Sequence, residues 1–178
     1  MKKLIAALAV CLMVLCLFTA CTAKDDQTDA QQTEAPKSDV ANPLVESDAD
    51  EILQQIGFAL GIPEGAENVQ YFILNGDTEE VHFSLDGLDY VARLKSTASF
   101  EDISGMCYEW TNTVDSELNE RECKLMRYCG TDGDIDLCLW YDAAPGVMYS
   151  LSTSDSSLDG FDITAVALEV FEPMQGES

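Results

Sequence analysis

Strand-like segments follow one another through the middle of this 178-residue chain, and the connections between them are mostly too short to hold a helix. From Glu80 to Leu85 apolar and polar residues alternate, and Asp86-Gly87 is a dipeptide typical of two-residue type I′ hairpin turns. The alternation resumes from Leu88 to Leu94. Hairpins join antiparallel neighbours, whereas parallel neighbours need long crossover connections. We therefore predict an antiparallel sheet.

Two helical patterns flank the strand-like segments. The first begins at Ser47-Asp48, either of which can cap a helix, and ends at Gly61. The second runs from about residue 158 to 171 and carries a clean apolar stripe. We predict the α+β class: a twisted, mainly antiparallel sheet of about six to seven strands with an N-terminal and a C-terminal helix packed on it. The expected strands are 69–74, 80–85, 88–94, 106–113, 122–129, 135–141 and 147–152.

The amino terminus has the order of features that is typical of an export signal. Lys2 and Lys3 precede an apolar run from residue 4 to 20, and small residues lead directly to Cys21. A cysteine at that point predicts a lipoprotein signal, with cleavage before Cys21 and attachment of fatty-acyl chains such as palmitate to it. The alternative is an uncleaved transmembrane anchor, because a run of this length is at the short limit for a membrane span.

These patterns predict four parts of the chain. Residues 1–20 are the signal peptide, 21–46 the lipidated cysteine with a flexible acidic linker, 47–174 a single α+β domain, and 175–178 a disordered tail. The expected location is the extracellular face of the cell membrane, where the protein is held by its lipid.

Charge narrows the class of partner. After residue 20 the chain has 7 basic and 33 acidic residues, a net charge of −26. Such a field repels phosphate backbones, so nucleic acid is excluded as a partner. The same field attracts cations or basic peptides, and otherwise serves as a self-repelling, soluble surface.

Four cysteines lie in the predicted domain: Cys107, Cys123, Cys129 and Cys138. An even number in an exported domain suggests disulfides, with three possible connectivities. The spacings contain no CxxC pair, which disfavours zinc. If the strands at 106–113 and 122–129 pair about a turn near Leu118, Cys107 falls near Cys129, and this is the pairing that we favour.

No catalytic constellation is visible in the sequence. His82 lies on the polar face of a strand and has no evident nucleophile or orienting partner, so a structural role is expected. Asp132, Asp134 and Asp136 alternate as in a calcium loop, but the glycine and glutamate that such a loop needs are missing. We predict no metal site, no cofactor and no enzymatic activity. Arg93 is expected to pair with Glu101 or Asp102.

Aromatic residues gather in the second half of the chain. Tyr108, Trp110, Tyr128 and Trp140 fall on strand-like segments that carry large apolar groups on both faces. The first interpretation is core, with covering elements on both sides of the sheet. The alternative is an aromatic-lined groove for a peptide, a glycan or a lipid moiety.

Several short motifs resemble a known group of proteins. They are Ile62–Val69, Tyr90–Arg93, Phe100–Gly105, Leu139–Asp142, Tyr149–Leu151 and Asp159–Asp162. Over about residues 50–172 the chain resembles the uncharacterised lipoproteins of Gram-positive, clostridia-like bacteria that carry one extracellular domain of unknown function. The resemblance implies a cell-surface location and assigns no catalytic residue.

The first functional hypothesis is a membrane-anchored, non-catalytic module that binds an envelope protein or a small ligand. The second is a cysteine-dependent envelope enzyme, which would need a free thiol of lowered pKa near His82. The third is a carrier or sensor whose half-open sheet holds an apolar ligand.

Overall fold

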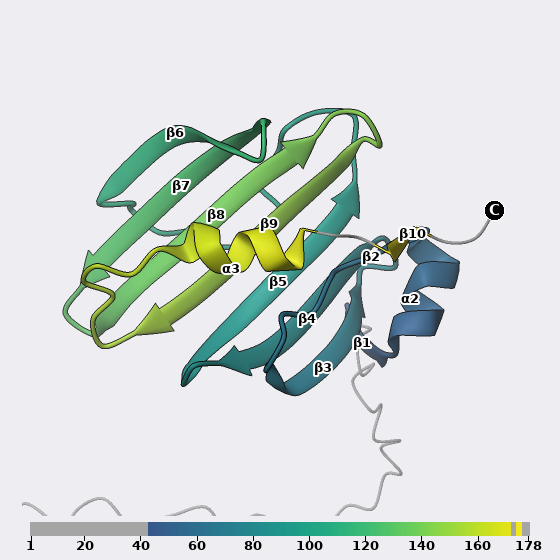
Figure 1. The fold of residues 1–178 in the computed structure, drawn as a ribbon, viewed down its shortest axis with the longest axis horizontal. Helices are drawn as coiled ribbons and strands as arrows, with labels where there is room; N and C mark the ends of the chain where they lie inside the picture. The colour runs from purple at the N-terminus through teal and green to yellow at the C-terminus, as the bar shows by residue number, and fades with distance from the viewer. Residues whose placement is uncertain (1–42, 172–173, 176–178) are drawn as a thin grey trace, which may run out of the picture. The chain divides into compact units, whose positions relative to one another are not determined.

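The computed structural model describes residues 43–171 and 174–175. The predicted signal peptide, Cys21 and almost all of the predicted linker lie outside the described residues. The elements of the described part are drawn in Figure 1.

Eight antiparallel strands form one sheet in the order β1-β3-β4-β5-β9-β8-β7-β6. The α+β class and the antiparallel sheet are confirmed, and the sheet has more strands than the six to seven predicted. The strands are β1 (Leu44–Ser47), β3 (Glu67–Leu74), β4 (Thr78–Leu85), β5 (Leu88–Ser96), β6 (Asn112–Leu118), β7 (Arg121–Gly130), β8 (Gly133–Asp142) and β9 (Val147–Asp155). A separate small sheet pairs β2 (Phe58–Ala59) with β10 (Met174–Gln175).

The large sheet consists of two runs of antiparallel strands, β1-β3-β4-β5 and β9-β8-β7-β6, that meet at β5 and β9. The β4–β5 turn is the predicted one, with φ of 52° at Asp86 and 83° at Gly87, as a type I′ turn requires. The β6–β7 turn also has two positive φ values, 49° at Asn119 and 65° at Glu120. Since β5 pairs with β9 along seven residues, the two runs form one continuous surface.

The prediction failed at the edge strand β6. The expected strand 106–113 is mostly irregular, and the strand lies at Asn112–Leu118, which the sequence analysis treated partly as a connector. This strand is polar because six of its seven residues are exposed at the edge of the sheet. Segment 97–111 is apolar for a different reason: it crosses one face of the sheet, where Phe100, Ile103 and Trp110 pack on Leu137, Leu139 and Met148.

Both helices are shorter than predicted. Helix α2 (Ala49–Ile56) has Asp48 as its N-cap and ends at Gly57, whose φ of 87° stops the helix before Gly61. Helix α3 (Ile163–Val170) starts at Asp162, whose side chain accepts a hydrogen bond from the Thr164 backbone N–H. Residues 158–161 precede it as a turn, so the expected start near Leu158 is wrong.

The sheet has two unlike faces. The face that we call the α3 face carries the larger core. There α3 and the segment with Leu60, Ile62 and Ala66 pack with Val81, Phe83 and the stacked pair Trp140 and Tyr149. The other face, called the opposite face, is covered by segment 97–111 over part of its area. Figure 1 shows α3 lying across β8 and β9 and leaving β6 and most of β7 beside it.

Candidate functional site

A groove lies on the α3 face between the start of α3 and the edge strand β6. Its volume is about 210 Å³. Val114 of β6 stands at its outer side with 46% of its surface exposed, and Leu125 of β7 packs at the edge of the main core. Phe161 and Ile163 form the wall on the side of α3. The groove is therefore an apolar depression at a place where the covering layer stops before the end of the sheet.

An ion pair closes the polar side of this groove. The guanidinium of Arg127 forms a two-point contact with Asp136, and the distance from Nε to Oδ1 is 2.5 Å. Its Nη2 also donates to the Phe161 carbonyl at 3.3 Å. The hydrogen bond to Asp136 raises the pKa of Arg127 above its ordinary value. Because Arg127 links β8 to the turn before α3, it fixes the wall of the groove.

The outer edge of β6 adjoins the groove. Among the described residues, no strand pairs with this edge, since β6 is the last strand in the order of the sheet. An edge of this kind presents backbone N–H and C=O groups that an extended peptide can use. Asp115 and Glu117 keep the strand acidic.

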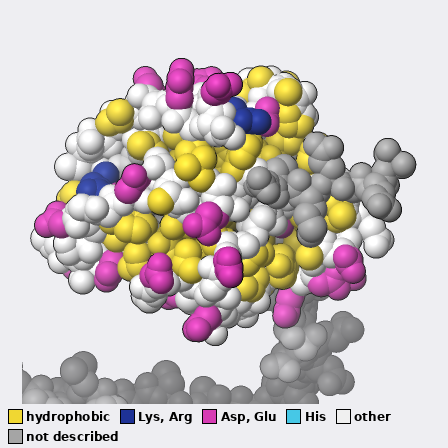
Figure 2. All heavy atoms as spheres, in the orientation of Figure 1, with side chains coloured by type: hydrophobic (Ala, Val, Ile, Leu, Met, Phe, Trp, Pro, Cys, Tyr) yellow, Lys and Arg dark blue, Asp and Glu magenta, His cyan; other side chains and the backbone are white. Residues whose placement is uncertain are grey.

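The domain that carries the groove is strongly negative. Residues 43–171 contain 26 carboxylates and 5 cations. Each of these cations forms an ion pair with a carboxylate: Arg93–Glu80, Lys95–Asp77, Arg121–Asp142, Lys124–Asp115 and Arg127–Asp136. Figure 2 shows hydrophobic atoms on both sides of α3 with carboxylates spread among them.

The structure brings together three of the four aromatic residues predicted to line a groove. Tyr108 contacts Trp110 at 5.8 Å and Tyr128 at 5.0 Å between ring centroids, and it is 44% exposed. Trp140 does not join them, because it points to the α3 face, is fully buried and stacks on Tyr149. The strand alternation already separated Trp140 from the residues on the opposite face, but it could not show which face held the core.

The cysteines divide into an exposed and a buried pair. Cys107 and Cys129 are exposed thiols, and their predicted bond stays a prediction. Cys123 and Cys138 are buried with their sulfur atoms 3.6 Å apart, a proximity that the sequence analysis did not predict.

His82 and Arg93 share one buried carboxylate on the opposite face. Nε2 of His82 lies 2.7 Å from Oε1 of Glu80, and Nε of Arg93 lies 2.7 Å from Oε2. Arg93 also donates to the carbonyl groups of Ile103 and Ser104, so the expected pairing with Glu101 or Asp102 is wrong. Within residues 43–171, the hydrogen-bonding partner of His82 is Glu80, and no thiol takes that place.

Two carboxylates of the alternating motif Asp132, Asp134 and Asp136 form contacts that stabilise the fold. Asp134 accepts a hydrogen bond from the backbone of Leu158, and Asp136 pairs with Arg127. In the part of the chain that the structure describes, no three histidine, cysteine, aspartate or glutamate side chains converge as a metal site. Over the same residues, no helix has both the length and the apolarity to cross a bilayer.

Comparisons with protein families, with curated proteins and with solved structures found no match to this chain. The resemblance to clostridial surface lipoproteins therefore stays a prediction.

Proposed function

We propose that this protein is a lipid-anchored module on the extracellular face of the cell membrane that binds an extended basic peptide segment of an envelope protein. In this proposal the peptide pairs with the outer edge of β6 and places an apolar side chain in the groove beside α3. The module acts by binding alone, without catalysis.

The observation that carries the proposal is the position of an unpaired strand edge directly beside an apolar depression. Backbone pairing along β6 would supply affinity, and the groove would select an apolar side chain at one alternate position of the peptide. A volume of about 210 Å³ is of the size of one large side chain rather than of a whole lipid. The groove therefore favours a peptide over an apolar carrier function.

The charge of the domain favours a basic partner. The 26 carboxylates outnumber the 5 cations in residues 43–171, and every one of those cations is already paired. A peptide with lysine or arginine beside its apolar residue would be drawn to this surface, and an acidic peptide would be repelled.

The anchor is supported by the basic start, the apolar run and Cys21 at its end. Metabolic labelling with an alkyne fatty acid in a Gram-positive host tests it. We expect label on the wild-type protein, loss of label and release from the membrane in Cys21→Ser, and unchanged label in the matched variant Cys16→Ser. Label that persists in Cys21→Ser would contradict lipidation at this residue.

To test binding, a capped seven-residue peptide that alternates lysine and valine is added to the full chain, and the NMR shifts of the backbone amides are followed. We expect shifts in the amides of Asn112–Leu118 and in residues of the groove. Val114→Lys places a cation in the groove and should weaken binding about tenfold, which corresponds to about 1.4 kcal/mol.

Thr113→Lys is the matched control, since it adds the same charge one residue away on the other side of β6. It should weaken binding much less than Val114→Lys. Equal effects of the two variants, or equal binding of a peptide that alternates glutamate and valine, would contradict the proposed site.

A further inference from the structure

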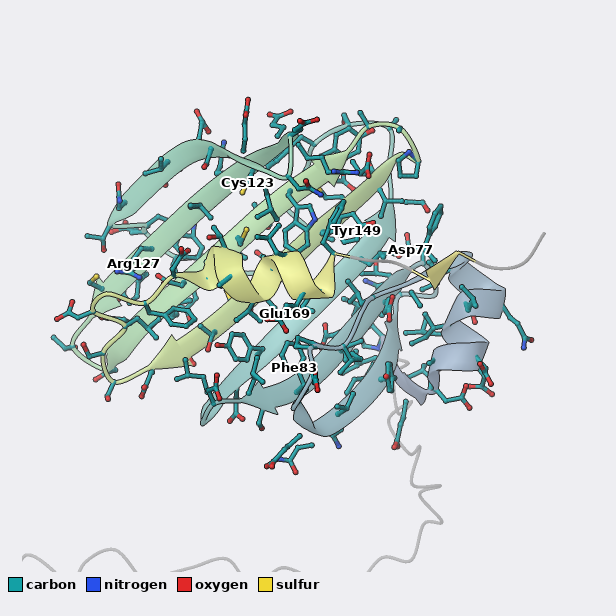
Figure 3. All side chains as sticks on the ribbon, viewed as in Figure 1. Asp77, Phe83, Cys123, Arg127, Tyr149 and Glu169 are labelled. Atoms are coloured by element: carbon teal, nitrogen blue, oxygen red, sulfur yellow. The ribbon has the colours of Figure 1, made fainter. Side chains whose placement is uncertain are left out.

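Two buried thiols from neighbouring strands meet in the larger core. Cys123 of β7 lies opposite Trp140 of β8, and Cys138 of β8 lies opposite Leu125 of β7, so the two cysteines occupy diagonal positions on one face. Their sulfur atoms are 3.6 Å apart, and the residues are 2% and 0% exposed. Figure 3 labels Cys123 close to α3, on the side of β7 and β8 that the helix faces.

We propose that Cys123 and Cys138 form a disulfide bond that links β7 to β8 within the core under α3. A disulfide has a sulfur–sulfur distance of about 2.05 Å, so the two atoms need to approach by about 1.5 Å in total. Diagonal neighbours on adjacent strands are about 7 to 8 Å apart, which is at the limit for a bridge. Closing the bond therefore requires a small shift of β7 against β8 as well as rotation of the two side chains, whose sulfur atoms are already in contact.

The contact also prepares the pair for exchange. A hydrogen bond between the two sulfur atoms holds the pKa of Cys123 below its ordinary value, while the same bond and burial raise the pKa of Cys138. While this contact exists, Cys123 is the more readily ionised of the two thiols, and the thiolate is the form that attacks a disulfide.

The oxidant is a disulfide of a thiol oxidoreductase or a small-molecule disulfide. The Cys123 thiolate attacks one sulfur of this disulfide, which breaks its S–S bond and releases the first thiol after protonation. Cys138 then loses its proton and attacks Sγ of Cys123, which forms the internal bond and releases the second thiol. The two cysteines lose two electrons and two protons, and the oxidant gains them.

This pairing differs from the Cys107–Cys129 bond expected from the sequence and does not depend on it. Cys107 and Cys129 are exposed, so they can react with solutes whether or not they are near each other. Cys123 and Cys138 are shielded once α3 covers them, so we expect their bond to form during folding, after β7 and β8 have paired and brought the thiols into contact but before the core has closed. The bond should then resist reductants until the protein unfolds.

The test is to refold the full chain in a buffer of reduced and oxidised glutathione, to block free thiols, and to map peptides without reduction. Cleavage after lysine and arginine combined with cleavage before aspartate puts each of the four cysteines on its own peptide. We expect peptide 122–124 to be linked to peptide 136–141, with a mass two hydrogen atoms below the sum of the two thiol forms. We also expect the urea midpoint of unfolding to be higher for the oxidised than for the reduced protein.

The double variant Cys107→Ser/Cys129→Ser is the matched control and should form the same link, with the same rise in midpoint. Adding Cys123→Ser to this double variant should abolish the oxidation-dependent rise. If Cys123 and Cys138 are recovered as free thiols from the refolded wild-type and double-variant proteins, or if Cys123 is linked to any other cysteine, the proposal is overturned.

Discussion

Glu79 and Glu80 are neighbours on β4, both are buried, and they face opposite sides of the sheet, at 0% and 4% exposure. Glu80 has two basic side chains on its oxygen atoms, His82 and Arg93. Glu79 accepts one hydrogen bond, from the backbone N–H of Leu60 at 2.9 Å, and no described residue donates to its second oxygen. Burial raises the pKa of Glu79 to about 8.

The comparison shows that the two faces differ in whether their buried polar atoms have hydrogen-bonding partners. On the opposite face, Arg93 satisfies both the carboxylate and the carbonyl groups of segment 97–111. On the α3 face, three buried polar atoms have no hydrogen-bonding partner within residues 43–171 and 174–175: Oε1 of Glu79, Nε1 of Trp140 and the hydroxyl oxygen of Tyr149. The residues that carry them lie in one row across the sheet, with Leu94 between Glu79 and Tyr149.

The largest expected effect comes from removing the cation of the opposite face. Arg93→Met should lower the free energy of unfolding by about 3 to 5 kcal/mol, because it leaves the Glu80 carboxylate buried without its main counter-charge. Lys95→Met is the control on the same strand and face, where the ion pair with Asp77 is exposed, and it should cost less than about 1 kcal/mol. Urea denaturation measures both. Similar losses of unfolding free energy in the two variants would show that the buried Glu80 carboxylate does not need the charge of Arg93.

The next largest effect is on the α3 face, where the ionised form of Glu79 lowers the free energy of unfolding. The pKa of Glu79 is raised from 4.5 to about 8 in the folded protein, so folding favours the protonated form. Its contribution to stability is full below pH 4.5 and falls as the pH rises toward 8. Between pH 4.5 and pH 7, wild-type protein should lose about 3 kcal/mol relative to Glu79→Gln, which cannot ionise.

The pH series of unfolding free energies should be measured for wild type, for Glu79→Gln and for Glu64→Gln, which changes an exposed carboxylate. Glu64→Gln should follow the wild-type curve within about 0.5 kcal/mol. A constant difference between wild type and Glu79→Gln over this range of pH would show that Glu79 is ionised in the folded protein.

The smallest effect separates a hydroxyl group that is bonded from one that is not. The Ser152 hydroxyl donates to the Val91 carbonyl at 3.3 Å, so Ser152→Ala should cost about 1 kcal/mol. Tyr149→Phe removes a buried hydroxyl for which the described part of the chain offers no partner, and it should be neutral or stabilising by up to about 1 kcal/mol. Thermal and urea denaturation of both variants measure the contrast. A larger loss for Tyr149→Phe than for Ser152→Ala would mean that its hydroxyl is satisfied.

The local hairpins were predictable because their signals are local. The alternation of β4 and β5 and the Asp86-Gly87 turn come from neighbouring residues, and β7, β8 and β9 were found from the same pattern. The edge strand β6 was not found, because its exposed polar residues give no alternation of burial. Phe100, Ile103 and Trp110 of segment 97–111 are partly buried against the sheet, and the strand predicted at 106–113 is wrong for most of its length.

The candidate site was less predictable than the fold. The sequence pointed to Tyr108, Trp110 and Tyr128, which do meet, but it gave no sign of the groove beside α3, whose residues come from three strands and a helix. Cys123 and Cys138 are 15 residues apart in sequence, and the diagonal register of β7 and β8 is what puts their sulfur atoms in contact.

The sequence by itself determined the class of the fold, the antiparallel hairpins and the strong negative charge, since each depends on residue type and short-range spacing. Only the tertiary structure decided which face of each strand is covered, which cation reaches which carboxylate, and where the covering layer ends. The physical reason is that burial and pairing depend on elements far apart in the chain. Glu79 and Glu80 are the same residue type at adjacent positions, and only what packs on each face gives Glu80 two basic partners and raises the pKa of Glu79 to about 8.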